Sequence, residues 1–156
     1  CVPAEAVPQQ VVLLGGETHT VSSKIPHEDI AVAASPGPTG AAVGGATTRA
    51  PLGALFGSRS GDKGGNANLG IFARSDAAWI WLDEFLTVER LQELLPETAP
   101  LRVERHRLPA IRSLNFMLYG LLEEGVAAST RQDGQAKSLG EWLRARVVDL
   151  PVELLP

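Results

Sequence analysis

One short segment concentrates much of the polar chemistry of this 156-residue chain. Residues 59–68 read Arg-Ser-Gly-Asp-Lys-Gly-Gly-Asn-Ala-Asn, which places two cations, a carboxylate and two amides beside three glycines. Glycines let successive backbone N–H groups turn toward one concavity, and a neighbouring Lys or Arg adds a full positive charge. The segment therefore predicts a phosphate or carboxylate site, and its contributing residues are Arg59, Ser60, Gly61, Lys63, Gly64, Asn66 and Asn68.

Asp62 and Lys63 are the candidate catalytic residues of this segment. Asp62 would act as an acid or a base, and Lys63 or Arg59 would be its electrostatic partner. A structural interpretation stays open beside this one, in which the segment is a solvated hairpin loop and Asp62 pairs with Arg59 or Lys63. The spacing excludes a Walker loop, because the Gly-x-x-x-x-Gly-Lys-Ser/Thr pattern is missing.

A second polar cluster, made of Arg131, Asp133 and Lys137, lies further along the chain. In a compact sandwich it could face the first segment. The alternative is that Asp133 caps a helix and that the two cations are solvated. Asn115 is a further candidate, because a buried amide needs hydrogen-bond partners and could orient a loop or a ligand.

The other reactive side chains predict neither a metal site nor a nucleophile. His19, His27 and His106 lack the spacing of metal ligands. Ser60 has no adjacent His and no nucleophile elbow, so acyl transfer through its hydroxyl is unsupported. Cys1 has no neighbouring base to form the thiolate, and we interpret its place at the start of the chain as a fragment boundary.

Composition and charge limit the classes of protein to which the chain can belong. Apolar residues make up 44% and charged residues 21%, which is typical of a soluble globular domain. The formal net charge of -4 leaves no excess of cations for a nucleic-acid backbone, so we expect no nucleic acid as a partner. No run of about 20 apolar residues could span a membrane. The single cysteine allows no intrachain disulfide, and we expect a cytoplasmic protein.

The chain changes character near residue 51. Residues 1–50 are rich in Pro, Gly and Ala and carry little apolar bulk, so they predict an irregular tail or linker. Only residues 11–14 resemble a strand there. Residues 51–156 carry regular apolar patterns and predict one folded domain.

Apolar spacing predicts a mixture of strands and helices in this domain. The most regular helical pattern spans 111–122, where Gly125 would follow as a left-handed cap and where one face holds Ile111, Leu114, Leu118, Leu121 and Leu122. The order of the elements predicts an α+β fold arranged as a two-layer sandwich. The other expected elements are strands at 52–56, 69–72, 101–108 (an edge strand) and 126–130, and helices at 79–86, 88–95 (N-cap Thr87) and 139–147.

The Gly-rich segment is followed by an ordered series of short motifs. They are Asn66-Ala67-Asn68-Leu69-Gly70-Ile71, Leu86-Thr87, Val103-Glu104-Arg105, Leu114-Asn115-Phe116, Gly125-Val126, Ser129, Asp133, Gln135-Ala136-Lys137 and Leu139-Gly140. Together with the segment that begins at Arg59, they resemble the C-terminal domain of the acyclic terpene utilisation (AtuA-like) family. The resemblance extends over residues 51–150 and implies a ferredoxin-like fold.

In that family this domain normally follows a much larger N-terminal domain. The family is associated with the breakdown of acyclic terpenes and related branched acids as coenzyme A thioesters. The resemblance therefore implies an accessory or substrate-handling domain, with a larger AtuA-like domain or subunit as partner, a homo- or hetero-oligomeric state and an acyl-coenzyme A thioester as ligand. Two alternatives stay open: an autonomous small acyl-CoA lyase or hydratase that uses Asp62, and a non-catalytic assembly module.

Overall fold

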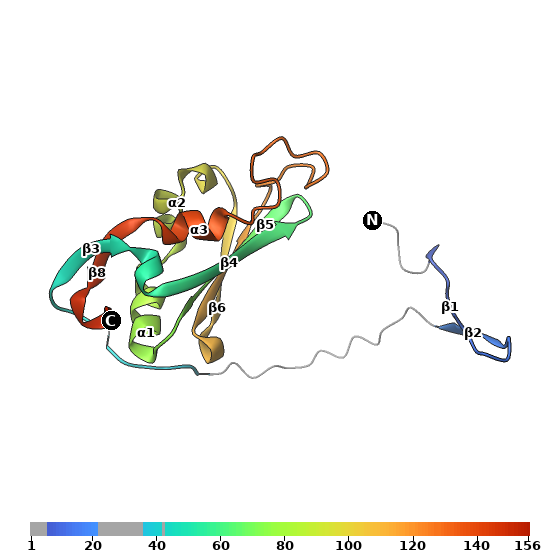
Figure 1. Ribbon diagram of the computed structural model, residues 1–156, viewed down its shortest axis with the longest axis horizontal. Coiled ribbons are helices and arrows are strands. Elements are labelled where there is room, and N and C mark those ends of the chain that lie inside the picture. The colour runs from blue at the N-terminus through green and yellow to red at the C-terminus, as the bar shows by residue number, and fades with distance from the viewer. Residues whose placement is uncertain (1–5, 22–35, 42) are drawn as a thin grey trace. The chain divides into compact units, whose positions relative to one another are not determined.

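The computed structural model describes residues 6–21, 36–41 and 43–156, and the chain divides into two compact units at residues 34 and 35. The first unit contains an antiparallel hairpin of β1 (Gln9–Val12) and β2 (Thr18–Val21) (Figure 1). The strand expected at 11–14 overlaps β1, but every residue of the two strands is exposed, so the hairpin has no core of its own. Cys1 and His27 lie outside the described residues.

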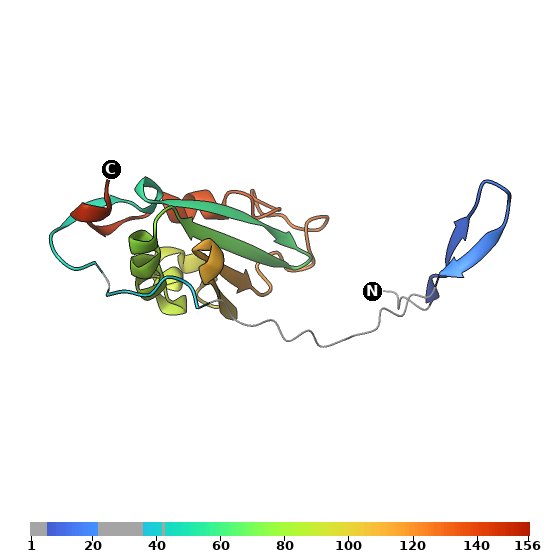
Figure 2. The same cartoon turned by 90° about the horizontal axis from the view of Figure 1, so that it is seen from below.

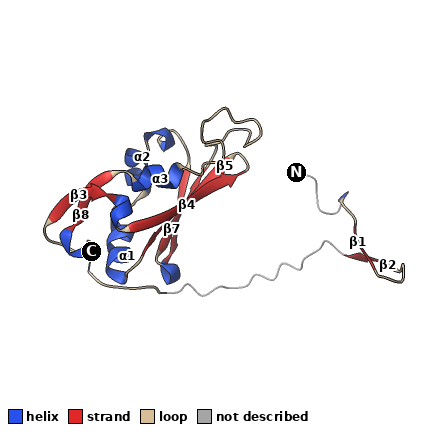
Figure 3. Cartoon of the chain, in the orientation of Figure 1, coloured by secondary structure: helices blue, strands red, loops and turns tan. Residues whose placement is uncertain are grey.

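The second unit is built on a four-stranded antiparallel sheet whose strand order is β4-β5-β7-β6 (Figure 3). Three helices accompany it and share one apolar core with the sheet. The predicted α+β architecture is confirmed. The elements are β4 (Phe56–Lys63), β5 (Asn66–Ala73), α1 (Asp76–Phe85), α2 (Val88–Leu94), β6 (Val103–Leu108), β7 (Ser113–Leu118) and α3 (Leu139–Arg144).

Most of the Gly-rich segment lies in strands, and it is not a loop between the strands expected at 52–56 and 69–72. β4 continues through Lys63, the chain turns at Gly64 and Gly65, and β5 starts at once, so that Lys63 pairs with Asn66. Gly64 has a φ of 65°, in the left-handed region that tight two-residue hairpin turns require. Because backbone groups of an extended strand point alternately to opposite sides, the N–H groups of β4 do not gather into the anion-binding nest predicted from the glycines.

β7 corrects the helix predicted at 111–122. Leu114, Phe116 and Leu118 are fully buried, whereas Ile111, which the helical pattern placed on the same face, is 67% exposed. Every second residue from Leu114 to Leu118 is buried, as in a strand with one buried face. The sequence does not reveal this alternation, because Leu114 and Leu118 also fit the apolar face of a helix. Gly125 has the expected left-handed φ, 103°, but it lies in a turn after β7 and caps no helix.

The C-terminal part of the chain differs from the prediction at two further places. Residues 126–128 form a turn and 129–130 are irregular, so the expected strand is not there. α3 ends at Arg144, and Val147, expected in the same helix, begins strand β8 (Val147–Pro151). β8 pairs with β3 (Thr47–Pro51), and the two strands lie side by side in both views (Figure 1, Figure 2). The predicted division between residues 50 and 51 therefore runs through β3.

The elements between β5 and β7 follow the prediction. α1 covers the stretch expected as a helix, and Ser75 caps it by accepting a hydrogen bond from the N–H of Ala78. Thr87 is the N-cap of α2, as predicted, and accepts from the N–H of Arg90 at 3.1 Å. β6 is an edge strand, as predicted.

Asp83, near the end of α1, holds this helix against β6. Its carboxylate accepts hydrogen bonds from Arg105 at 2.7 Å and from Nε of Arg107 at 2.9 Å. Arg105 also donates to the carbonyl oxygen of Leu86, at 2.9 Å. Burial raises the pKa of Asp83, but the hydrogen bonds and positive charges of Arg107 and Arg105 outweigh it and hold the pKa below its usual value.

Two substitutions distinguish strand β7 from the helix that was predicted for the same residues. Leu118→Ala should lower the free energy of unfolding by about 2–5 kcal/mol, because the side chain is fully buried. Ile111→Ala should change it by less than about 0.5 kcal/mol, because that side chain is largely exposed. Urea denaturation followed by circular dichroism measures both values, and equal losses would contradict the strand.

Truncation tests whether β3 belongs to the domain. A chain that starts at Pro51 loses most of β3 and uncovers β8, so its free energy of unfolding should fall by at least about 1 kcal/mol, the net value of one or two hydrogen bonds. A chain that starts at Pro36 keeps β3 and should match the full chain. If both truncated chains melt at the same temperature, β3 contributes nothing to stability.

The lowered pKa of Asp83 makes its contribution to stability dependent on pH. The contribution is fully present above the pKa of the unfolded chain, about 4, and is lost as the pH falls toward the lower folded value. Asp83→Asn should lower the free energy of unfolding at pH 7 by about 1–3 kcal/mol and reduce its decline between about pH 5 and pH 3. Urea denaturation at several pH values measures this, and an unchanged decline would refute it.

Candidate functional site

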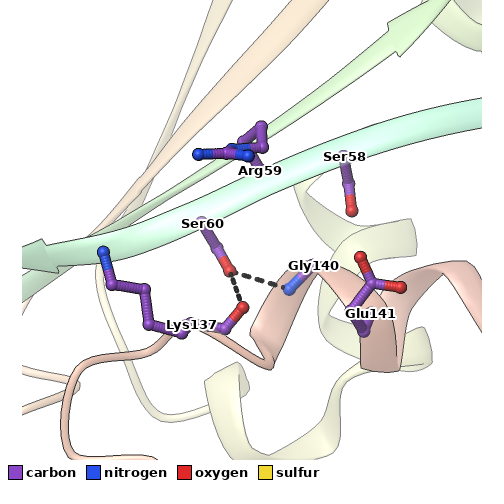
Figure 4. Close-up of a pocket in the computed structure, with 6 residues that line it drawn as sticks. All are labelled: Ser58, Arg59, Ser60, Lys137, Gly140 and Glu141. Atoms are coloured by element: carbon purple, nitrogen blue, oxygen red, sulfur yellow. Dashed lines mark hydrogen bonds between the residues drawn. The ribbon is translucent and has the colours of Figure 1, made fainter.

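A cavity of about 240 Å³ lies between the edge strand β4 and the start of α3 (Figure 4). Five of its six lining residues carry a charge or a hydroxyl, and only Gly140 does not. The cavity brings part of the Gly-rich segment together with part of the second polar cluster, although the two are far apart in sequence. The lining residues are Ser58, Arg59, Ser60, Lys137, Gly140 and Glu141.

Ser60 joins β4 to the chain that leads into α3. Its hydroxyl donates to the carbonyl oxygen of Lys137 at 3.1 Å and accepts from the N–H of Gly140 at 2.9 Å. Both the donor and one acceptor position of the hydroxyl are therefore used inside the protein. Ser60 was predicted as an anion ligand, and in this geometry it positions the residues on the other wall of the cavity.

Gly140 allows α3 to approach β4 this closely. A Cβ at this position would lie 2.6 Å from Oγ of Ser58 and 3.4 Å from Oγ of Ser60. Any side chain would therefore push α3 away from the strand and disturb the hydrogen bonds of Ser60. Ser58 itself is only 9% exposed, and its hydroxyl has no hydrogen-bond partner among the described residues.

Two cationic residues border the cavity, Arg59 on β4 and Lys137 in the chain before α3. Side chains alternate along a strand, so Arg59 projects to the side of β4 opposite Ser58 and Ser60, as Figure 4 shows. Nζ of Lys137 lies 3.6 Å from the place of a Cβ on Gly61, which is on the same side of β4 as Arg59. In the part of the chain that the structure describes, neither Arg59 nor Lys137 forms an ion pair.

Asp133 fixes the segment that carries Lys137. Its two carboxylate oxygens accept from the N–H groups of Lys137 at 2.8 Å and Ser138 at 2.9 Å. Asp133 therefore caps no helix, because the N-cap of α3 is Ser138 and it receives no side-chain hydrogen bond. Instead Asp133 orders the residues just before α3, and Lys137 and part of the Gly-rich segment line the same cavity. Arg131 is exposed and does not line the cavity.

The remaining predicted site residues lie elsewhere. Lys63 donates to the carbonyl oxygen of Asp62 at 2.9 Å beside the hairpin turn. Asn66 accepts from the N–H of Gly120 at 2.9 Å, and Asn68 donates to Oδ1 of Asn115 at 3.2 Å. Asp62, Lys63, Gly64, Asn66 and Asn68 do not line the cavity, and neither does Asn115. The two asparagine interactions join β5 to β7 and to the turn after it.

The sequence reasoning missed Ser58, Gly140 and Glu141. Ser58 stands two residues before Ser60, so both hydroxyls share one side of a strand, but this signal requires that 56–63 be recognised as a strand. Gly140 and Glu141 lie in the first turn of α3 and give no sign in sequence of the strand that they face.

The described residues contain no group of three or more His, Cys, Asp or Glu side chains that could hold a metal ion. Across the same residues, the structure contains no helix with the length and apolar character needed to cross a membrane.

Comparison with known proteins identifies the family. No curated protein and no solved structure matches the chain. A family model described as the AtuA ferredoxin-like domain matches residues 50–149, which is most of the chain and includes every residue that lines the cavity. This match confirms the resemblance drawn from the sequence motifs and the ferredoxin-like fold that it implied. The chain belongs to the AtuA ferredoxin-like domain family.

Proposed function

We propose that this chain is a substrate-handling accessory domain of an AtuA-like protein, and that the cavity between β4 and α3 binds an anionic group of the substrate. One observation carries the proposal: Arg59 and Lys137 both line the same polar cavity, and neither is in an ion pair within the described structure. An anion bound at the edge of β4 would accept charge-assisted hydrogen bonds from Lys137, whose Nζ lies near Gly61, and from Arg59, which projects to the same side of the strand.

The size and lining of the cavity favour a polar head group over an acyl chain. A volume of about 240 Å³ is below the usual range of about 300–1,000 Å³ for sites that enclose a whole small molecule. Apolar side chains are missing from its lining, so a branched chain would gain nothing there. A carboxylate, or a phosphate of coenzyme A, fits both properties, and the rest of the ligand would extend outward.

The proposal includes a larger partner and a setting. A ligand held only by its head group leaves its reactive part accessible to a second domain or subunit, which is the role that the AtuA-like resemblance implies. We place this activity in the cytoplasmic breakdown of acyclic terpenes or related branched acids as coenzyme A thioesters. An autonomous acyl-CoA lyase or hydratase has less support, because Asp62, its candidate acid or base, is not part of the cavity.

Titration of the full chain tests the anion site. Coenzyme A and short branched acyl-CoA esters should bind to the wild type, and Arg59→Ala and Lys137→Ala should each weaken binding by about one to two powers of ten, because each removes a charge-assisted contact of about 1.5–3 kcal/mol. Higher salt should weaken the wild type more than the variants. Chemical shifts of backbone amides can follow even weak binding.

Lys63→Ala is the matched control, because Lys63 lies on the same strand but outside the cavity. It should leave the dissociation constant within about twofold, since a surface charge contributes little. The proposal is refuted if Lys63→Ala weakens binding as strongly as Lys137→Ala, or if neither Arg59→Ala nor Lys137→Ala changes it. It is equally refuted if the full chain binds no coenzyme A ester at millimolar concentration.

A further inference from the structure

We infer that Ser58 is a further ligand-binding residue of this cavity, and that together with Glu141 it selects a short acid that also carries a hydroxyl group. The inference rests on the proposed function, because the anion site supplies the other end of the same ligand. It names the class of molecule that the cavity accepts.

Ser58 occupies a position where packing alone would favour an apolar side chain. It faces the helices two residues after Phe56, and its partner in the ladder is Ile71, which is fully buried. Oγ of Ser58 has no hydrogen-bond partner among the described residues. A buried hydroxyl without a partner destabilises a fold, and Ser58 is one of the residues that border the polar cavity. An unsatisfied polar atom in such a place is expected where a ligand completes the site.

Glu141 supplies the complementary group at this end of the cavity. Figure 4 shows the hydroxyl of Ser58 and the carboxylate of Glu141 directed into the same space, while the amino group of Lys137 lies on the far side of Ser60. The carboxylate accepts from Arg144 at 2.9 Å, and its oxygens keep further lone pairs for another donor. The cavity therefore has a cationic end and an end that offers one hydroxyl and one acceptor.

A hydroxyl group on the ligand matches both groups at the second end. It can accept a hydrogen bond from Ser58 and donate one to Glu141, whereas a ketone can only accept and a methylene group can do neither. A carboxylate on the same molecule would lie toward Arg59 and Lys137. Gly140 lies against the hydroxyl of Ser58, so a ligand can reach it only if the first turn of α3 shifts outward from β4.

Three acids of nearly equal size test the selection on the full chain: 3-hydroxybutyrate, acetoacetate and butyrate. The wild type should bind 3-hydroxybutyrate about three- to tenfold more tightly than either of the others, as one hydrogen bond predicts. Ser58→Ala should abolish this preference and leave the affinity for butyrate unchanged. Glu141→Ala should also abolish the preference, and because it removes a negative charge from the cavity it should tighten the binding of all three acids; Glu124→Ala, at an exposed acid outside the cavity, should keep the preference.

Thermal unfolding supplies a second readout, in which Ser58→Ala should cause no loss. Ser58→Ala removes a buried hydroxyl that has no partner, so it should raise or preserve the melting temperature while it removes selectivity. Equal binding of the three acids to the wild type overturns the inference and leaves the anion site intact. The same holds if Ser58→Ala keeps the preference for the hydroxy acid. Failure of all three acids and of coenzyme A to bind overturns the proposed function and this inference together.

Discussion

The close approach of α3 to β4 is the constraint on which the cavity depends. It is possible because Gly140 has no side chain, and it is fixed because Ser60 forms hydrogen bonds to both Lys137 and Gly140. These two hydrogen bonds set the position of the chain before α3, and Asp133 holds the same segment from its other side. The places of Lys137 and Glu141 follow from this arrangement.

An edge strand suits such a site for a physical reason. A strand inside a sheet has neighbours on both sides, whereas β4 is paired only with β5 and leaves its other side free. Because side chains alternate, this single free edge presents hydroxyls toward the helices and Arg59 toward the opposite side. Lys137 comes from α3's side of the edge and ends near Gly61, where the missing side chain leaves room. One short stretch of chain could therefore contact a ligand from two directions, as the proposed anion site requires.

Local signals in the sequence predicted the parts of the fold that local interactions determine. The cap at Thr87, the helix after Ser75 and the edge strand β6 are of this kind. Strand β4 was not predictable in this way, because a glycine normally weakens a strand. In β4 the ring of Phe72, from the neighbouring strand, fills the space that a side chain of Gly57 would occupy, and this contact is not visible in the sequence. β7 was misread because its leucines fit two periods. The contact between Ser60 and Lys137 joins residues 77 positions apart, and no local pattern encodes it.

The connection between α3 and β8 has a mechanical consequence. Only two residues separate the end of the helix from the start of the strand, which is too short a link to absorb a displacement. A helix that yields to admit a ligand therefore pulls on β8, and the antiparallel ladder passes that pull to β3. β3 follows a segment that already contacts the domain, because Gly37 lies against Pro109 and Gly40 against Ile80. The ladder of β3 and β8 therefore restrains α3, and a displacement of the helix that forms one wall of the cavity would strain a second sheet.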